Sequence, residues 1–147
     1  MTKSIIFFDI DGTLLSETTH IVPESTKLAL KKAKDNGHLL FINTGRASSN
    51  IDNYIKDFEF DGYVCGCGTY IEFKNKELFS KTLDNAFSKE LVKNIRECKL
   101  DGIIESKTAT YYDDFIYGPE VKEIKEHHVL KEGQVIKTFD DERSEER

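Results

Sequence analysis

The first apolar run of the chain ends in two acids, a glycine and a threonine: Ser4-Ile5-Ile6-Phe7-Phe8-Asp9-Ile10-Asp11-Gly12-Thr13. A short continuous apolar run such as Ser4–Phe8 is typical of a β-strand that is buried on both faces. The loop Asp9–Thr13 then leaves the carboxyl end of that strand. Ligands of open α/β sheets bind beyond such ends, so this stretch predicts both a fold class and a site.

Strand and helix patterns alternate along the following residues. Pro23 and Glu24 suit the first turn of a helix, and Asn36-Gly37 suits its end. A second continuous apolar run, Leu39–Ile42, follows directly. Further along, we expect a helix over Ala47–Phe58 and a strand over Gly62–Cys65. Strand, helix, strand, helix, strand at this spacing predicts a parallel sheet with right-handed crossovers.

The second apolar run ends at Asn43-Thr44-Gly45-Arg46. This loop and Asp9–Thr13 both lie at carboxyl ends of predicted parallel strands. They therefore face the same crevice if the two strands are neighbours.

After Gly68 the pattern changes to hairpins and helices. Residues 70–80 predict a hairpin around Asn75, and Gly102–Glu105 with Thr110–Tyr112 predict another. The organisation we expect is a parallel α/β segment over 1–82, a smaller α+β segment over 83–140 and a charged tail over 141–147.

Composition limits the classes of partner. The formal net charge of −6 disfavours nucleic acid or an anionic membrane as the main partner. No apolar run is long enough to span a bilayer or to serve as a secretory signal, which favours a cytoplasmic location. The spacing of Cys65, Cys67 and Cys98 does not match a zinc site, and reduced thiols are the simpler interpretation.

The two carboxylates of Asp9 and Asp11 indicate metal-assisted phosphoryl chemistry. Two close negative charges favour a divalent cation, and Mg²⁺ prefers oxygen ligands and keeps waters that a phosphate can displace. One carboxylate can attack phosphorus, and the other can protonate the leaving oxygen and later activate water. Gly12 lets the backbone turn sharply, so that amides can point at phosphate oxygens. The competing interpretation is a solvated acidic turn.

Asp9-Ile10-Asp11-Gly12-Thr13 resembles the first motif of the haloacid dehalogenase-like (HAD) phosphatases, and Ile42–Arg46 resembles their second. The resemblance implies that Asp9 is the nucleophile and Asp11 the general acid/base. It also implies that Mg²⁺ is bound by the Asp9 carboxylate and the Asp11 main-chain carbonyl. Thr44 would hold the phosphoryl group, with Gly45 and Arg46 beside it at the substrate.

The Thr-Gly-Arg form of the second motif is most similar to the Cof-type branch, which implies half of a Rossmann-like core followed by part of an α+β cap. Segment 65–69 stands where that branch commonly has Asn-Gly, and Cys67 departs from the pattern. Arg46 can touch substrate or pair with a neighbouring acid, and both interpretations stay open.

The resemblance covers only the first half of the family pattern, since the lysine and acidic motifs of that branch come after the cap. We therefore expect a truncated product or one half of a split enzyme, with a second copy or a complementing chain as partner. Asp140-Asp141 and Asp113-Asp114 are weaker candidates for the missing metal ligands.

The substrate expected from the resemblance is a small phosphorylated metabolite. Two other functions compete with catalysis: a non-catalytic fragment that binds metal or a partner, and a phospho-accepting signalling domain. The acids of such signalling domains usually follow different strands, which argues against the second alternative.

Overall fold

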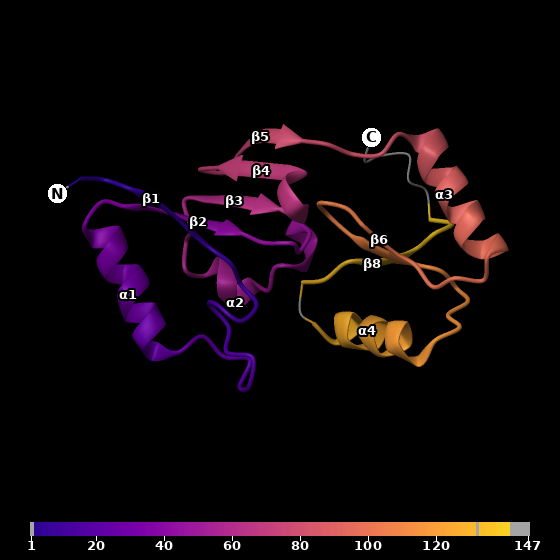
Figure 1. Cartoon of the computed structure of the whole chain (residues 1–147), viewed down its shortest axis with the longest axis horizontal. Coiled ribbons are helices and arrows are strands. Elements are labelled where there is room, and N and C mark those ends of the chain that lie inside the picture. Colours follow the sequence, from indigo (N-terminus) through magenta and orange to yellow (C-terminus); the bar gives the residue numbers. More distant parts are fainter. Residues whose placement is uncertain (1, 132, 142–147) are drawn as a thin grey trace. The chain divides into compact units, whose positions relative to one another are not determined.

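The computed structural model describes residues 2–131 and 133–141 (Figure 1). Contacts divide the chain into two compact units, Met1–Ser80 and Lys81–Arg147, whereas the sequence placed the boundary after residue 82. The first unit contains β1 (Ile5–Phe8), α1 (Glu24–Asp35), β2 (Leu39–Asn43), α2 (Asn53–Lys56), β3 (Gly62–Cys65), β4 (Tyr70–Phe73) and β5 (Lys76–Ser80), with short 3₁₀ turns at Ser48–Asn50 and Gly66–Gly68.

The first unit is built on one mixed sheet with the strand order β1-β2-β3-β4-β5. β1, β2 and β3 are parallel neighbours, and the β4–β5 hairpin continues the sheet in antiparallel fashion. Lys74 and Asn75 turn that hairpin with positive φ angles of 50° and 60°, as the primed two-residue turns require. The predicted α/β class with a parallel sheet is confirmed.

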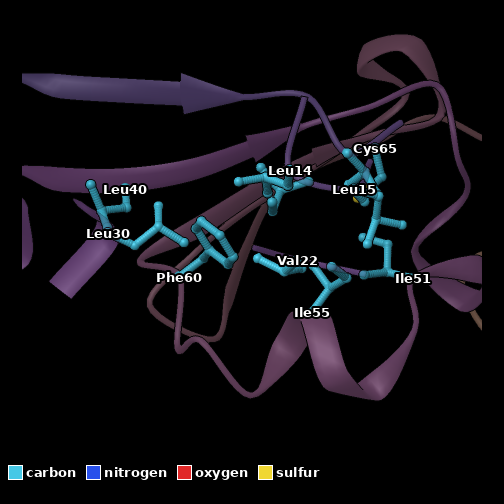
Figure 2. Close-up of a cluster of buried hydrophobic side chains, with 11 residues drawn as sticks. Leu14, Leu15, Val22, Leu30, Leu40, Ile51, Ile55, Phe60 and Cys65 are labelled. Atoms are coloured by element: carbon cyan, nitrogen blue, oxygen red, sulfur yellow. The ribbon is translucent and has the colours of Figure 1, made fainter. Parts of the chain in front are cut away.

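Helices α1 and α2 pack against the same face of this sheet. Leu30 of α1 and Ile55 of α2 share one core with Leu40 and Ile42, which alternate along β2 and so point to one side. Figure 2 shows this core, to which the loop after β1 contributes as well. The members fully or almost fully withdrawn from solvent are Ile10, Leu14, Leu15, Val22, Leu30, Leu40, Ile42, Ile51, Ile55, Phe60 and Cys65.

The prediction that the first strand is buried on both faces of the sheet is wrong. β1 is not buried on both faces, because Ile5 and Phe7 are 55% and 54% exposed. Only Ile6 and Phe8 of this strand pack on the core. The physical reason is that β1 is an edge strand, and both helices packed on the core cover the other face.

The prediction of a continuous helix over Ala47–Phe58 is also wrong. The segment forms a 3₁₀ turn at Ser48–Asn50 and only one helical turn, α2. Between them, Ile51 and Asp52 have extended backbones with ψ angles of 121° and 143°. Serine, asparagine and aspartate hydrogen-bond to nearby backbone and so favour turns and caps over helix interiors.

The second unit contains α3 (Asn85–Glu97), β6 (Ile103–Glu105), β7 (Thr110–Tyr112), α4 (Pro119–Leu130) and β8 (Ile136–Thr138). Its sheet has the order β6-β7-β8, with the predicted β6–β7 hairpin antiparallel and β8 parallel to β7. Over the described ranges, no helix combines the length and the apolar character needed to cross a membrane. Of the tail expected at 141–147, residues 142–147 lie outside the described residues.

One acid of each pair proposed as alternative metal ligands in this unit is bound to an arginine. Arg96, in the last turn of α3, donates to both oxygens of Asp113 at 2.8 and 2.9 Å. It also donates to both oxygens of Asp140 at 3.1 and 2.8 Å. The hydrogen bond from Arg96 lowers the pKa of Asp113. These contacts give Asp113 and Asp140 a structural role that links α3 to the ends of two strands.

Candidate active site

The loop that carries the two acids is wound around one carbonyl group. The main-chain oxygen of Ile10 accepts hydrogen bonds from the amides of Thr13, Leu14 and Leu15 at 3.3, 3.0 and 2.9 Å. The Ile10 side chain is fully buried, whereas Asp9 and Asp11 on either side are exposed. The buried isoleucine thus fixes the loop and leaves both carboxylates at the surface.

Gly12 allows this tight path. Its φ of 73° lies in the left-handed region, where a residue with a Cβ is strained. A Cβ at this position would also meet Glu17 Oε1 at 2.8 Å. The glycine is therefore required by the backbone, as its place after two acids predicts.

The second loop, Thr44–Arg46, leaves the neighbouring strand β2. Phe8 pairs with Ile42 in the β1–β2 register, so the chain reaches Asp9 and Thr44 at the same edge of the sheet. Thr44 is 4% exposed, and its amide donates to the Val64 carbonyl at 2.9 Å. Its hydroxyl oxygen accepts from the Arg46 amide at 3.2 Å.

A third loop, Gly66–Gly68 after β3, supports the second. The Gly66 amide donates to the Arg46 carbonyl at 2.8 Å, and the Cys67 amide donates to the Thr44 carbonyl at 3.4 Å. Cys67 has φ 54° and ψ 34°, a left-handed conformation that glycine and asparagine adopt most readily. The backbone of this loop therefore has the shape expected of Asn-Gly, although a cysteine occupies the position.

Arg46 connects the second loop to the first. Its Nε donates to Asp11 Oδ2 at 2.9 Å and its Nη2 to Asp11 Oδ1 at 2.6 Å, a bidentate pair. Of the two interpretations of Arg46, pairing with a neighbouring acid is the one present in this structure, and contact with a substrate stays a prediction.

The other side of the Arg46 guanidinium faces inward. Nη1 donates to Asp52 Oδ2 at 2.9 Å and to the Asn50 carbonyl at 3.3 Å. The Tyr54 hydroxyl donates to the same Asp52 oxygen at 3.3 Å. Burial alone would lower the pKa of Arg46, but the hydrogen bonds to Asp11 and Asp52 outweigh it and raise that pKa. The guanidinium is thus a fixed cation between a surface acid and a buried one.

Three members of this network escaped prediction from the sequence: Asn50, Asp52 and Tyr54. All three lie within the helix predicted over Ala47–Phe58, and no contact between them and Arg46 was predicted. The available signal was the composition of 48–53, which is rich in residues that favour caps and turns.

The donors for a metal at this site are few. Among residues 2–131 and 133–141, no group of three or more His, Cys, Asp or Glu side chains lies close enough together to hold an ion. Asp9 and Asp11 nevertheless supply carboxylate and carbonyl oxygens, the donor type that Mg²⁺ prefers. The Asp9 carboxylate and the Asp11 main-chain carbonyl, the donors that the resemblance implies, could hold Mg²⁺ without displacing Arg46 from the Asp11 carboxylate.

The cysteines do not form a second site. Cys65 is buried and Cys67 and Cys98 are exposed, and all three are free thiols. Burial raises the pKa of Cys65 to about 11, so its thiol is neutral at neutral pH. These properties agree with reduced thiols.

The carboxyl edge of the parallel strands β1 and β2 thus carries two acids, a threonine and an arginine. Residues 6–147 match the family described as haloacid dehalogenase-like hydrolase. The chain belongs to this family, so the family predicted from the sequence is confirmed.

Two similar proteins of Bacillus subtilis (strain 168) are named as phosphatases. The putative phosphatase YkrA of Bacillus subtilis (strain 168) is 28% identical over 99 residues, which are 67% of this chain and 38% of YkrA. YwtE of the same organism, named a 5-amino-6-(5-phospho-D-ribitylamino)uracil phosphatase, is 33% identical over 125 residues, or 85% of this chain and 41% of YwtE. The chain thus spans about two fifths of the length of these relatives.

A solved structure, that of a sugar phosphatase of HAD subclass IIB, is similar with a TM-score of 0.74 and 27% sequence identity. The match covers 94% of this chain and 53% of that one. Nearly the whole chain therefore corresponds to about half of that structure.

Proposed function

We propose that this chain carries the nucleophile half of a Mg²⁺-dependent phosphatase that hydrolyses a small phosphorylated metabolite through an aspartyl-phosphate intermediate. The observation that carries the proposal is the bidentate contact between Arg46 and Asp11. This contact joins the loops that follow β1 and β2, the two loops that resemble the family's catalytic motifs.

The roles proposed for the two acids are those that the family resemblance implies. An Asp9 carboxylate oxygen attacks phosphorus and the bond to the leaving oxygen breaks, which gives an acyl phosphate on Asp9. Asp11 enters this step protonated and donates its proton to the leaving oxygen, which leaves it as a carboxylate. It then takes a proton from the water that attacks the acyl phosphate, and this second step regenerates Asp9 and releases phosphate.

Thr44 and Gly45 would bind the phosphoryl group. The Thr44 oxygen already accepts a hydrogen bond from the Arg46 amide, so its own proton remains available for a phosphoryl oxygen. The Gly45 amide lies in the same loop. Donors placed in advance at developing negative charge stabilise the transition state.

Mg²⁺ would be held by the Asp9 carboxylate and the Asp11 main-chain carbonyl, where it would neutralise charge on the phosphoryl oxygens. Two protein ligands leave most of the coordination to water, so we expect weak binding by this chain alone. The names of the relatives, which include a pyridoxal phosphate phosphatase of Escherichia coli (strain K12), support a small phosphorylated substrate. We also propose a cytoplasmic location, in keeping with such substrates.

The test is steady-state hydrolysis of 4-nitrophenyl phosphate with and without Mg²⁺. The Asp9→Asn chain, whose amide cannot act as the nucleophile, is the blank. Magnesium-dependent hydrolysis above this blank supports the proposal, and hydrolysis that Asp9→Asn retains in full refutes the role of Asp9. An acyl phosphate on Asp9 that persists for hours would point to phospho-acceptor signalling instead.

A non-catalytic half that binds a partner is the second candidate, and the exposed edge strand favours it. Ile5 and Phe7 present apolar side chains beside the unpaired edge of β1, a surface suited to a complementing segment or a second copy. Light scattering of the purified chain distinguishes a monomer from an associated form.

A further inference from the structure

The inner half of the Arg46 network has no role in the proposed chemistry. Asp52, Asn50 and Tyr54 lie behind Arg46 and contribute no atom to the reacting groups. Arg46 nevertheless contacts both acids of the network with a single planar group. Because the guanidinium is planar and rigid, a contact that orients one edge of it also orients the other edge.

Exposure falls steadily from the outer acid to the inner one. The side chain of Asp11 is 60% exposed, that of Arg46 22% and that of Asp52 9%. The outer pair alone would be loosened by water and salt, whereas the inner pair is largely shielded. The buried end therefore determines where the guanidinium lies.

The backbone around Asp52 is fixed as well. Its carbonyl accepts from the amides of Ile55 and Lys56 at 3.0 and 3.3 Å, which makes Asp52 the N-cap of α2. Ile51 and Ile55 on either side are buried in the core. The break in the helix predicted over 47–58 is what turns the Asp52 carboxylate toward Arg46, since α2 begins only after Asp52.

We propose that Asp52 is a positioning residue, which holds the Arg46 guanidinium so that it aims the Asp11 carboxylate at the reacting phosphoryl group. This inference rests on the proposed function for the role of Asp11. It rests on geometry alone for the series of contacts that runs from Asp52 through Arg46 to Asp11. Tyr54 supports Asp52 by donating to the same carboxylate oxygen, Oδ2, that accepts from Arg46.

The first arm of the test needs no catalysis. The Arg46 Nε–H is held by Asp11, and ¹H–¹⁵N spectra record such a group when its exchange with water is slow. We expect Asp52→Ala to abolish this signal and Asp57→Ala, an exposed acid at the end of the same helix, to leave it unchanged. Persistence of the signal in Asp52→Ala overturns the inference.

The second arm is kinetic, with 4-nitrophenyl phosphate and Mg²⁺. Because misplaced catalytic groups cost rate steeply, we expect Asp52→Ala to lower kcat about tenfold with KM within about threefold. Asp52→Asn, which keeps an oxygen acceptor for Nη1, should recover most of kcat. Adding Asp52→Ala to Arg46→Ala should lower kcat no further, because Asp52 acts through Arg46. An additive loss in the double variant overturns the inference.

Thermal unfolding of each variant separates misplacement from unfolding. Should Asp52→Ala fail to fold, Tyr54→Phe removes only the supporting hydroxyl, and a fall in kcat of about twofold with unchanged KM is then expected. An unchanged kcat in that variant counts against the inference. If the unaltered chain hydrolyses no more than Asp9→Asn, the proposed function fails for this chain, and the spectra still decide the positioning role.

Discussion

Replacing Gly62 by alanine should cost the first unit much of its stability. Gly62 lies in the central strand β3, and a Cβ there would approach the Phe41 ring at 2.2 Å and the Glu72 carbonyl oxygen at 2.5 Å. Real Cβ atoms essentially never make contacts under 3.0 Å, so both neighbours would have to move. The Glu72 oxygen is main-chain and belongs to the adjacent strand β4, so it cannot swing aside.

The magnitude follows from these contacts. Overpacking of a tightly packed site costs about 1–3 kcal/mol. Phe41 also stacks on Phe73 at 5.6 Å and lies 5.3 Å from Phe7, and displacing it loosens pairs worth about 0.5–1.5 kcal/mol each. We expect a loss of about 3 kcal/mol, a large part of the total for a unit of about 80 residues. The corresponding fall in Tm is about 12–24 °C.

Gly45→Ala is the matched control. A Cβ at Gly45 would meet only Cys67 Sγ at 3.7 Å, an ordinary contact, and the backbone there is outside the left-handed region. Its effect on stability should be within about 0.5 kcal/mol. Urea unfolding followed by circular dichroism gives the free energies, and hydrogen exchange assigns the loss to residues 2–80. A Gly62→Ala chain as stable as Gly45→Ala would refute the packing of Phe41 over β3.

Three further predictions concern the acids and the chain as a whole. Arg96→Met should destabilise the chain at pH 7 by less than about 1 kcal/mol, because Arg96 is partly exposed. Since Arg96 holds the pKa of Asp113 below its ordinary value, this stabilisation is present above about pH 4 and lost on further acidification, so variant and parent should converge near pH 2 in urea titrations. Asp9→Asn should abolish magnesium-dependent hydrolysis of an aryl phosphate, measured by release of 4-nitrophenol. The 147-residue chain should turn over far more slowly than about ten per second, and a turnover near that typical value would contradict the weak magnesium binding expected of two ligands.

Much of the fold could be predicted because its signals are local. The end of α1 at Asn36-Gly37, the hairpin at Asn75 and the strand–loop boundary at Phe8 and Asp9 are each encoded within a few residues. The burial of β1 could not be predicted in this way. Whether Ile5 and Phe7 are covered depends on which elements pack on the sheet face opposite α1 and α2. An apolar run has the same sequence pattern on an edge strand as on a central strand.

The candidate site also has one part that could be predicted from the sequence and one part that could not. Asp9, Asp11, Thr44, Gly45 and Arg46 follow two strands that were predicted to be parallel. They lie at one edge of the sheet because β1 and β2 pair as neighbours, the condition on which the prediction depended. Asp52 comes to the site only because the chain turns between Ser48–Asn50 and α2. The composition of 48–53 favours such a turn. The contact between Arg46 and Asp52, six residues apart, joins side chains that helical periodicity does not bring together.

The most direct test of the central claim is a crystal structure of the chain with Mg²⁺ and beryllium fluoride, which mimics an acyl phosphate on a carboxylate. We expect beryllium bonded to an Asp9 oxygen, with the Thr44 hydroxyl within hydrogen-bonding distance of a fluoride, and no adduct in Asp9→Asn. An adduct on another carboxylate, or Thr44 turned away from the fluorides of an Asp9 adduct, would contradict it.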